Sequence, residues 1–202
     1  DFDPGRAKSL PWQNGFAGLA WNTEEIPGGL ESVDDLWSAD LKGKVTVLIE
    51  RRDTMGVLML ANGVDISGEG WGSDEFNAAI AVLEEHVTSG QIFGIKGNEY
   101  MQDFVSGDAL AAIAWSGDIT VLNAEAGYEK WKFALPDSGG TLWGDTFVVP
   151  MGSPRKTNAE TLMNYYYEPE VAAEVAAWVN YVTPVVGAKE AAEAIDPELA
   201  AN

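Results

Sequence analysis

The chain alternates between short apolar segments and longer segments with helical periodicity. Residues 9–22, SLPWQNGFAGLAWN, alternate small and aromatic side chains, and this pattern predicts an extended segment. Further short segments, rich in β-branched, aromatic or alanine residues, predict strands that pack in or against a core. These four further strands are predicted at residues 44–49, 109–115, 131–136 and 141–150.

Helices are predicted where apolar residues recur every three or four positions between recognisable ends. The clearest helix lies within residues 72–90, between Ser73 and Gly90. Its predicted apolar face consists of Phe76, Ile80, Leu83 and Val87. Other helices are predicted at residues 31–44, 54–63, 98–108, 117–128, 158–169 and 170–182, with a short Ala/Glu-rich helix near the C-terminus.

Several helix ends carry local signals. Ser32 with Asp35 and Thr157 with Glu160 have the spacing of a capping box, in which side chains satisfy the first backbone N–H groups. Pro169 suits the first turn of a helix, where its missing N–H costs nothing. Residues 50–53, ERRD, are interpreted as the segment between a strand and the helix that follows.

Strands that alternate with helices predict an α/β domain with a mostly parallel or mixed sheet. Ligands of such sheets bind in loops beyond the carboxyl ends of the strands. Acidic residues and tryptophans gather at those ends in this sequence. They are Glu50 and Asp53 after residues 44–49, Trp115 and Asp118 at the end of residues 109–115, and Trp143 and Asp145 after the glycine pair 139–140.

Trp143 and Asp145 suggest the chemistry of a cation site. Side chains two residues apart in a strand leave it on the same face, so an indole lies beside a carboxylate. An ammonium group gains a charge-assisted hydrogen bond from the carboxylate and about 0.5–2 kcal/mol from the indole face. Neighbouring carboxylates repel when the site is empty, so a linear polyamine, with cationic ends and an apolar stem, would relieve that repulsion.

Composition narrows the class of protein. Twelve basic and 32 acidic residues among 202 give a net charge of −20, which disfavours nucleic acid and anionic membrane surfaces. The chain has no cysteine and one histidine, His86, so thiolate chemistry is excluded and histidine catalysis is disfavoured. No stretch approaches the ~20 apolar residues that span a membrane. No phosphate-binding or dinucleotide motif occurs, and no cofactor is expected.

Other interpretations of the same residues remain open at this point. Each tryptophan could belong to the core, Asp118 could cap a helix, and Arg51 and Arg52 could neutralise the nearby carboxylates. A carboxylate pair such as Glu50 with Asp145 could hydrolyse a glycoside. Three tyrosines at 165–167 could ligate ferric iron, although packing is the favoured interpretation because they fan out around a helix.

The order of motifs resembles the spermidine/putrescine-binding proteins of bacterial ABC transporters. The segments that carry the resemblance are LPWQNGFAGLAWN, DLWSADLKGKVTVLIERRDTMG, NEYMQDFVSGDALAAIAWSGD, GGTLWGDTFVVP and NYVTP. The resemblance implies a non-enzymatic, extracytoplasmic receptor, in the periplasm or lipid-anchored, that binds a polyamine and serves a membrane permease. It also implies a periplasmic-binding-protein-like (type 2) α/β lobe, with a mixed central sheet flanked by helices and a C-terminal helical segment.

The resemblance also implies roles for individual residues. Glu50 and Asp53 match acidic residues that hold amine groups, although Glu50 is longer than the aspartate usual in the family. Trp115 matches an indole that contacts the polyamine, and Tyr181 matches a further aromatic residue of the cleft. Trp143 and Asp145 match a W-x-D motif that stacks on methylenes and binds an amine. Asp118 stands where the family more often has a small polar residue, so the resemblance makes it an additional candidate only.

The domain organisation follows from the same resemblance. Residues 1–18 are expected to form a hinge strand and a remnant of a first lobe, and residues 19–145 the second, ligand-binding lobe. Residues 146–202 would form a return crossover and helices that pack on the first lobe, which this sequence lacks. An apolar face on the helices within residues 157–180 would then invite dimerisation or domain exchange. Other cargoes for the same fold are ferric iron, a sugar or an amino-acid-like cation.

Overall fold

The computed structural model describes residues 3–195. Its strands are β1 (Ser9–Asn22), β2 (Val45–Leu48), β3 (Ile92–Lys96), β4 (Ala111–Trp115), β5 (Trp131–Ala134) and β6 (Thr141–Val148). Its α-helices are α1 (Arg51–Ala61), α2 (Ser73–Thr88), α3 (Tyr100–Ser106), α4 (Ser116–Ala126), α5 (Lys156–Tyr166), α6 (Pro169–Val179) and α7 (Ala188–Ile195). Two short 3₁₀ helices, η1 (Val33–Trp37) and η2 (Ala39–Leu41), precede β2.

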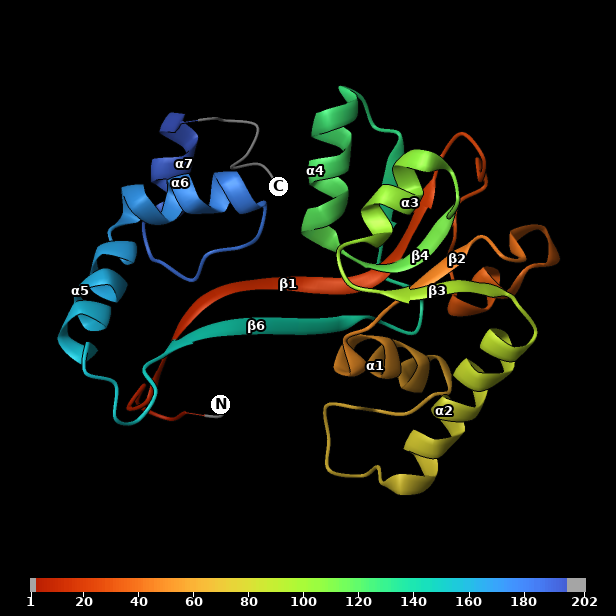
Figure 1. Ribbon diagram of the computed structural model, residues 1–202, viewed down its shortest axis with the longest axis horizontal. Coiled ribbons are helices and arrows are strands. Elements are labelled where there is room, and N and C mark those ends of the chain that lie inside the picture. The colour runs from red at the N-terminus through yellow and green to blue at the C-terminus, as the bar shows by residue number, and fades with distance from the viewer. Residues whose placement is uncertain (1–2, 196–202) are drawn as a thin grey trace. The chain divides into compact units, whose positions relative to one another are not determined.

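The strands form one mixed sheet in the order β3-β2-β4-β1-β5, with β6 also paired to β1. Strand β2 runs parallel to both of its neighbours, whereas β1 runs antiparallel to β4 and β5. Figure 1 shows α1 and α2 on one side of this sheet and α3 and α4 on the other. The α/β fold with a mixed sheet, predicted from the alternation of strands and helices, is therefore confirmed.

Strand β3 was not predicted from the sequence. It lies at the edge of the sheet, and its side chains Phe93 and Ile95 are exposed. Gly94 stands at the centre of the strand. The segment therefore lacks both the continuous apolar run of a buried strand and the polar alternation of a half-buried one. Edge strands with a central glycine are weak signals in any sequence.

Three predicted helix features need correction. Helix α1 begins at Arg51, so residues 50–53 are its cap and first turn and not a connecting segment. Helix α5 begins at Lys156 with Arg155 as its N-cap residue, so Thr157 lies inside the helix and does not cap it. On α2, Val87 is exposed, because the helix extends past the edge of the core that its other apolar residues contact. The predicted Ser32–Asp35 capping box and the position of Pro169 are both confirmed.

The chain divides into two units. One consists of Phe16–Trp143 and the other of Asp1–Gly15 with Gly144–Asn202, so β1 and β6 each contribute residues to both. The larger unit has an extensive core, whose fully buried side chains include Leu19, Leu58 and Ile113. The assignment of these units to the lobes of a receptor stays a prediction.

The smaller unit has a modest core and several exposed apolar side chains. Tyr166, Ala172, Val185 and Ala188 are buried together, and α6 packs on α7. Trp178 at the end of α6 is 86% exposed, and Leu162 and Val186 are also exposed. In residues 3–195 no helix combines the length and apolar character needed to cross a lipid bilayer.

The close pairing of β1 with β5 predicts that a larger side chain at Gly18 destabilises the sheet. A Cβ atom at Gly18 would lie 2.7 Å from the carbonyl oxygen of Ala134 and 3.0 Å from the ring of Phe133. We expect Gly18→Ala to lower the free energy of unfolding by about 1–3 kcal/mol, because the strands must move apart. Urea unfolding followed by circular dichroism measures the change.

Gly28 supplies the matched control for this substitution. A Cβ atom at Gly28 meets nothing within 4 Å, so Gly28→Ala should change stability by no more than about 1 kcal/mol. Equal unfolding midpoints for Gly18→Ala and Gly28→Ala would contradict the close packing of β1 on β5.

Candidate functional site

The candidate site begins at the carboxyl ends of β2 and β4. These strands are parallel neighbours, with Val45 opposite Ala111 and Thr46 opposite Ala112, so both end at the same edge of the sheet. Helix α1 follows β2 and leads towards β3, whereas α4 follows β4 and leads towards β5 at the other side of the sheet. The two connections diverge at this point, and such a divergence is where open α/β sheets bind ligands.

Asp53 lies in the first turn of α1 and is only 7% exposed. The indole Nε1–H of Trp115 donates to its Oδ2 atom at 2.8 Å, and the hydroxyl of Thr141 donates to its Oδ1 atom at 3.0 Å. Within residues 3–195 the ion pairs join Lys96 to Asp103, Lys130 to Glu24 and Lys156 to Glu160, and none includes Asp53. The Asp53 carboxyl group is therefore held by neutral donors, and no basic side chain of the described residues is paired with it.

Trp115 is the last residue of β4 and the N-cap residue of α4. Its indole is half-buried, packs against the core of the larger unit and lies 6.4 Å, centroid to centroid, from the ring of Tyr100. The structure thus brings together Asp53 and Trp115, two of the predicted site residues, across the gap between α1 and α4.

Asp118 occupies in α4 the position that Asp53 occupies in α1. It lies in the first turn and is 6% exposed. Its Oδ2 atom accepts hydrogen bonds from the amide of Asn98 and the hydroxyl of Tyr100, each at 2.9 Å. The proposed contact of Asp118 with a ligand stays a prediction.

Glu50 is exposed at the N-cap of α1. Its backbone carbonyl accepts from the N–H groups of Asp53 and Thr54, and its side chain makes no capping hydrogen bond. Arg51 and Arg52 are exposed as well, and neither appears among the ion pairs of the described residues. The neutralisation of Glu50 and Asp53 by these arginines, considered in the sequence analysis, is therefore not observed.

Trp143 and Asp145 both lie in β6, as predicted, so their side chains leave the strand on the same face. Thr141, whose hydroxyl donates to Asp53, lies two residues before Trp143 and therefore shares this face of the strand. Trp143 belongs to the larger unit and is half-buried, whereas Asp145 belongs to the smaller unit and is exposed. The membership of Asp145 in one site with Asp53 stays a prediction.

Tyr181 belongs to the smaller unit, directly after α6. It is half-buried and precedes Val182, whose backbone pairs with Asn14 of β1 in both directions. The backbone around Tyr181 is thereby fixed against β1, and the role of its ring in ligand binding stays a prediction.

Sequence analysis missed Thr141, Tyr100 and Asn98, which hold the two buried carboxylates. For Thr141 a signal existed, because it precedes Trp143 by two residues and must share its face of β6. Tyr100 and Asn98 carried no such signal, since their partner lies 18 and 20 residues further along the chain.

Gly56 permits the contact between Thr141 and Asp53. A Cβ atom at Gly56 would collide with Cγ2 of Thr141, so only a glycine lets the start of β6 approach the first turns of α1. The same approach brings the threonine hydroxyl to the Asp53 carboxylate, three residues earlier in the helix.

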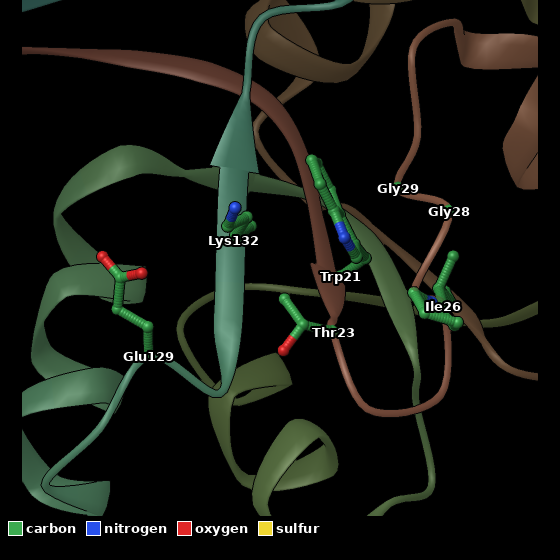
Figure 2. A pocket seen from close by; sticks show the side chains of 8 residues that line it. Trp21, Thr23, Ile26, Gly28, Gly29, Glu129 and Lys132 are labelled. Atoms are coloured by element: carbon green, nitrogen blue, oxygen red, sulfur yellow. The ribbon is translucent and has the colours of Figure 1, made fainter.

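A surface hollow of about 410 Å³ lies elsewhere on the larger unit. Figure 2 shows Trp21 of β1 and Lys132 of β5 on its wall, with the loop that carries Gly28 and Gly29 opposite and Glu129 nearby. None of the predicted site residues lines this hollow. A lysine ammonium on the wall and a largely covered indole make it a poor trap for a cation.

His86 and the tyrosine run have structural partners. The His86 ring stacks on Trp37 at 3.8 Å between centroids, which explains it without a ligand. The hydroxyls of Tyr166 and Tyr167 donate to the backbone carbonyls of Trp12 and Pro11, and burial raises the pKa of both phenols. Packing, the favoured interpretation of residues 165–167, is confirmed for Tyr166 and Tyr167, whereas Tyr165 is exposed.

Comparison with known proteins gives consistent similarities. A family model described as bacterial extracellular solute-binding protein matches residues 3–202. A spermidine/putrescine-binding periplasmic protein of Salmonella typhimurium is 27% identical over 98% of the chain and 55% of its own length. A putrescine-binding periplasmic protein of Escherichia coli is 24% identical over 93% of the chain and 55% of its own length. The chain thus spans about half the length of these curated relatives.

The fold is also found among solved structures. A putative spermidine/putrescine ABC transporter protein from Listeria monocytogenes superposes with a TM-score of 0.84 at 24% identity, covering 96% of the chain and 58% of that protein. The predicted periplasmic-binding-protein-like fold is therefore confirmed.

The two hydrogen bonds to Asp53 predict the effect of Thr141→Val. Valine keeps the shape of threonine but removes the donor to Oδ1, so a buried carboxylate oxygen loses its partner. We expect the free energy of unfolding to fall by about 1–3 kcal/mol, measured by urea unfolding.

Thr161→Val is the control, because the Thr161 hydroxyl bonds only to a backbone carbonyl in its own exposed helix turn. This substitution should stay within about 0.5 kcal/mol of the unsubstituted chain. A Thr141→Val variant as stable as the Thr161→Val variant would contradict the contact between Thr141 and Asp53.

Proposed function

Because the chain belongs to the family of bacterial extracellular solute-binding proteins, we propose that it forms part of a receptor that binds a polyamine and delivers it to an ABC permease. One observation carries this proposal. The Asp53 carboxylate is buried at the carboxyl ends of parallel strands, bonded to an indole and a hydroxyl, with no basic residue of the described chain paired to it.

A buried carboxylate with neutral donors favours a cationic ligand. Burial of an anion without a counter-ion costs free energy, and an ammonium group that enters the site recovers part of it. Each oxygen of Asp53 accepts one hydrogen bond from the protein and has a further lone pair for a ligand. A neutral sugar would leave the charge unbalanced, so an amine is the better match.

The aromatic residues suit the apolar part of a polyamine. Trp115 lies directly beside Asp53, and Trp143 follows Thr141 on the same face of β6. Indole rings offer flat surfaces on which methylene groups pack, and their faces attract ammonium groups. Glu50, Asp145 and Tyr181 are proposed as further contacts that would determine the number and spacing of amines bound.

The comparisons support the same class of ligand. The names of the Salmonella typhimurium and Escherichia coli relatives state that they bind spermidine, putrescine or both. The family is one of solute-binding proteins and not of enzymes, so the glycoside hydrolase alternative has no support. We therefore propose binding without chemistry, outside the cytoplasm, either in the periplasm or by a lipid-anchored receptor.

We further propose that the chain supplies the second lobe and the returning helices of a two-lobed receptor. The relatives are nearly twice as long as the part that this chain matches, which supports a first lobe outside these residues. The exposed Trp178, Leu162 and Val186 would then meet that lobe, or a second copy where the lobe is absent.

Titration calorimetry on the complete gene product tests the proposed ligand. We expect heat of binding with spermidine or putrescine, and none with a neutral sugar or ferric citrate. Affinity for the polyamine should fall as ionic strength rises, because the contacts are charge-assisted. Binding of the sugar or of iron without any response to polyamines would replace this proposal with another cargo.

Substitution of the acidic residues tests the proposed contacts. Asp53→Asn and Asp145→Asn keep the shape of each side chain and remove its charge, so each should weaken polyamine binding by about 1.5–3 kcal/mol. Asp40→Asn serves as the control, since Asp40 is exposed in η2 and belongs to no proposed contact. Calorimetry that returns equal affinities for Asp145→Asn and Asp40→Asn would remove Asp145 from the site.

A further inference from the structure

We propose that Tyr100 and Asp118 are positioning residues that fix Trp115 and, through its indole, the Asp53 carboxylate. This inference rests on the proposed function for its consequence in binding, but not for its geometry. It assigns Asp118 a role through Tyr100, in place of the direct ligand contact expected from the sequence.

The residues form one continuous chain of hydrogen bonds. The hydroxyl of Tyr100 donates to Oδ2 of Asp118 at 2.9 Å and accepts the backbone N–H of Trp115 at 3.2 Å. The indole of the same Trp115 then donates to Oδ2 of Asp53 at 2.8 Å. This series of hydrogen bonds therefore connects the first turn of α4, through α3 and the end of β4, to the first turn of α1.

The hydroxyl of Tyr100 is oriented by this arrangement. A phenol has one proton to donate, and here it goes to Asp118, which leaves an oxygen lone pair directed at Trp115. The acceptor of this bond is a carboxyl oxygen of Asp118 at 2.9 Å, which is within the ordinary range for an O–H···O bond. Tyr100 is 1% exposed and its ring packs edge-on against Phe104, so the hydroxyl cannot swing away.

The bond to Trp115 acts at the residue where backbone direction changes. Trp115 has extended backbone angles, φ −91° and ψ 139°, while the next residue begins α4. Its N–H lies at the N-cap, where α4 itself offers no acceptor, and the Tyr100 oxygen accepts it. Because the indole leaves the backbone at this residue, the direction fixed by Tyr100 determines where Nε1 lies relative to Asp53.

The position of Asp118 also favours this role. Asp118 lies in the first turn of α4 and is buried, so the packing around the helix start holds its side chain in place. The amide of Asn98 donates to the same Oδ2 atom and fixes the carboxylate from the other side. Asp118 is thus a fixed anchor for the tyrosine hydroxyl.

Tyr100→Phe in this chain tests the inference without any ligand. The indole ¹H–¹⁵N resonance of Trp115, identified by its loss in Trp115→Phe, reports the hydrogen bond to Asp53. Asp53→Asn defines the direction in which that resonance moves when the bond weakens. We expect Tyr100→Phe to move it in the same direction, and Asp118→Asn to move it likewise but less far.

Tyr128→Phe is the matched control, because the hydroxyl of Tyr128 donates to Glu24 at an exposed position away from this network. It should leave the Trp115 indole resonance unchanged. A merely structural role for Tyr100 would lower stability and leave the resonance of the folded protein in place. That result, or an unchanged resonance in Asp118→Asn if Tyr100→Phe does not fold, would overturn the inference.

Spermidine binding to the complete gene product gives the second readout. Tyr100→Phe should raise the Kd for spermidine about 2- to 10-fold, the effect of one lost hydrogen bond, while Tyr128→Phe leaves it unchanged. An unchanged Kd in Tyr100→Phe would overturn the inference. If the unsubstituted protein binds no spermidine, the proposed function fails, and the indole resonance alone decides whether Tyr100 positions Trp115.

Discussion

The parallel pairing of β2 with β4 is the constraint on which the site depends. Parallel neighbours end at the same edge of a sheet, so the helices that follow them, α1 and α4, begin side by side. Only this arrangement lets Trp115, at the end of β4, donate to Asp53, 62 residues earlier in the chain. The antiparallel strand β1 completes the sheet on the other side of β4 without disturbing that edge, because its residues pair along the length of β4.

This edge would ordinarily attract anions. Two helix N-termini present backbone N–H groups and the positive ends of their dipoles at the same place. Here an aspartate occupies the third position of each helix, Asp53 in α1 and Asp118 in α4, and both are buried. The dipoles then stabilise protein carboxylates in place of a bound anion. The donors to Asp53 are an indole and a hydroxyl, which carry no positive charge, and this supports the proposed preference of the edge for a cation.

Features set by local sequence were predictable, and those set by distant contacts were not. The strands at 44–49 and 109–115, the helix after each and the identity of Asp53 and Trp115 as neighbours at one edge all follow from patterns and the topology of α/β sheets. The edge strand β3 escaped detection, since Gly94 and the exposed Phe93 break the pattern of a strand. Thr141 and Tyr100 act through contacts 88 and 15 residues away, for which no periodicity exists. The N-cap of α5 was predicted at Thr157 because threonine is a good capping residue, but the helix begins one residue earlier, at Lys156.

The contact of Thr141 with Asp53 fixes more than one carboxylate oxygen. Side chains alternate along a strand, so a slip of β6 by one residue would turn every side chain to the opposite face. While Thr141 bonds to Asp53 and Gly56 leaves room for it, Trp143 must lie on the same face, about 7 Å further along the strand. Leu142 and Val148, on the alternate face, are exposed, which agrees with this register. The Thr141 hydroxyl therefore holds the carboxyl group of Asp53 in α1 and also determines which face of β6 carries the side chains of residues 143 and 145.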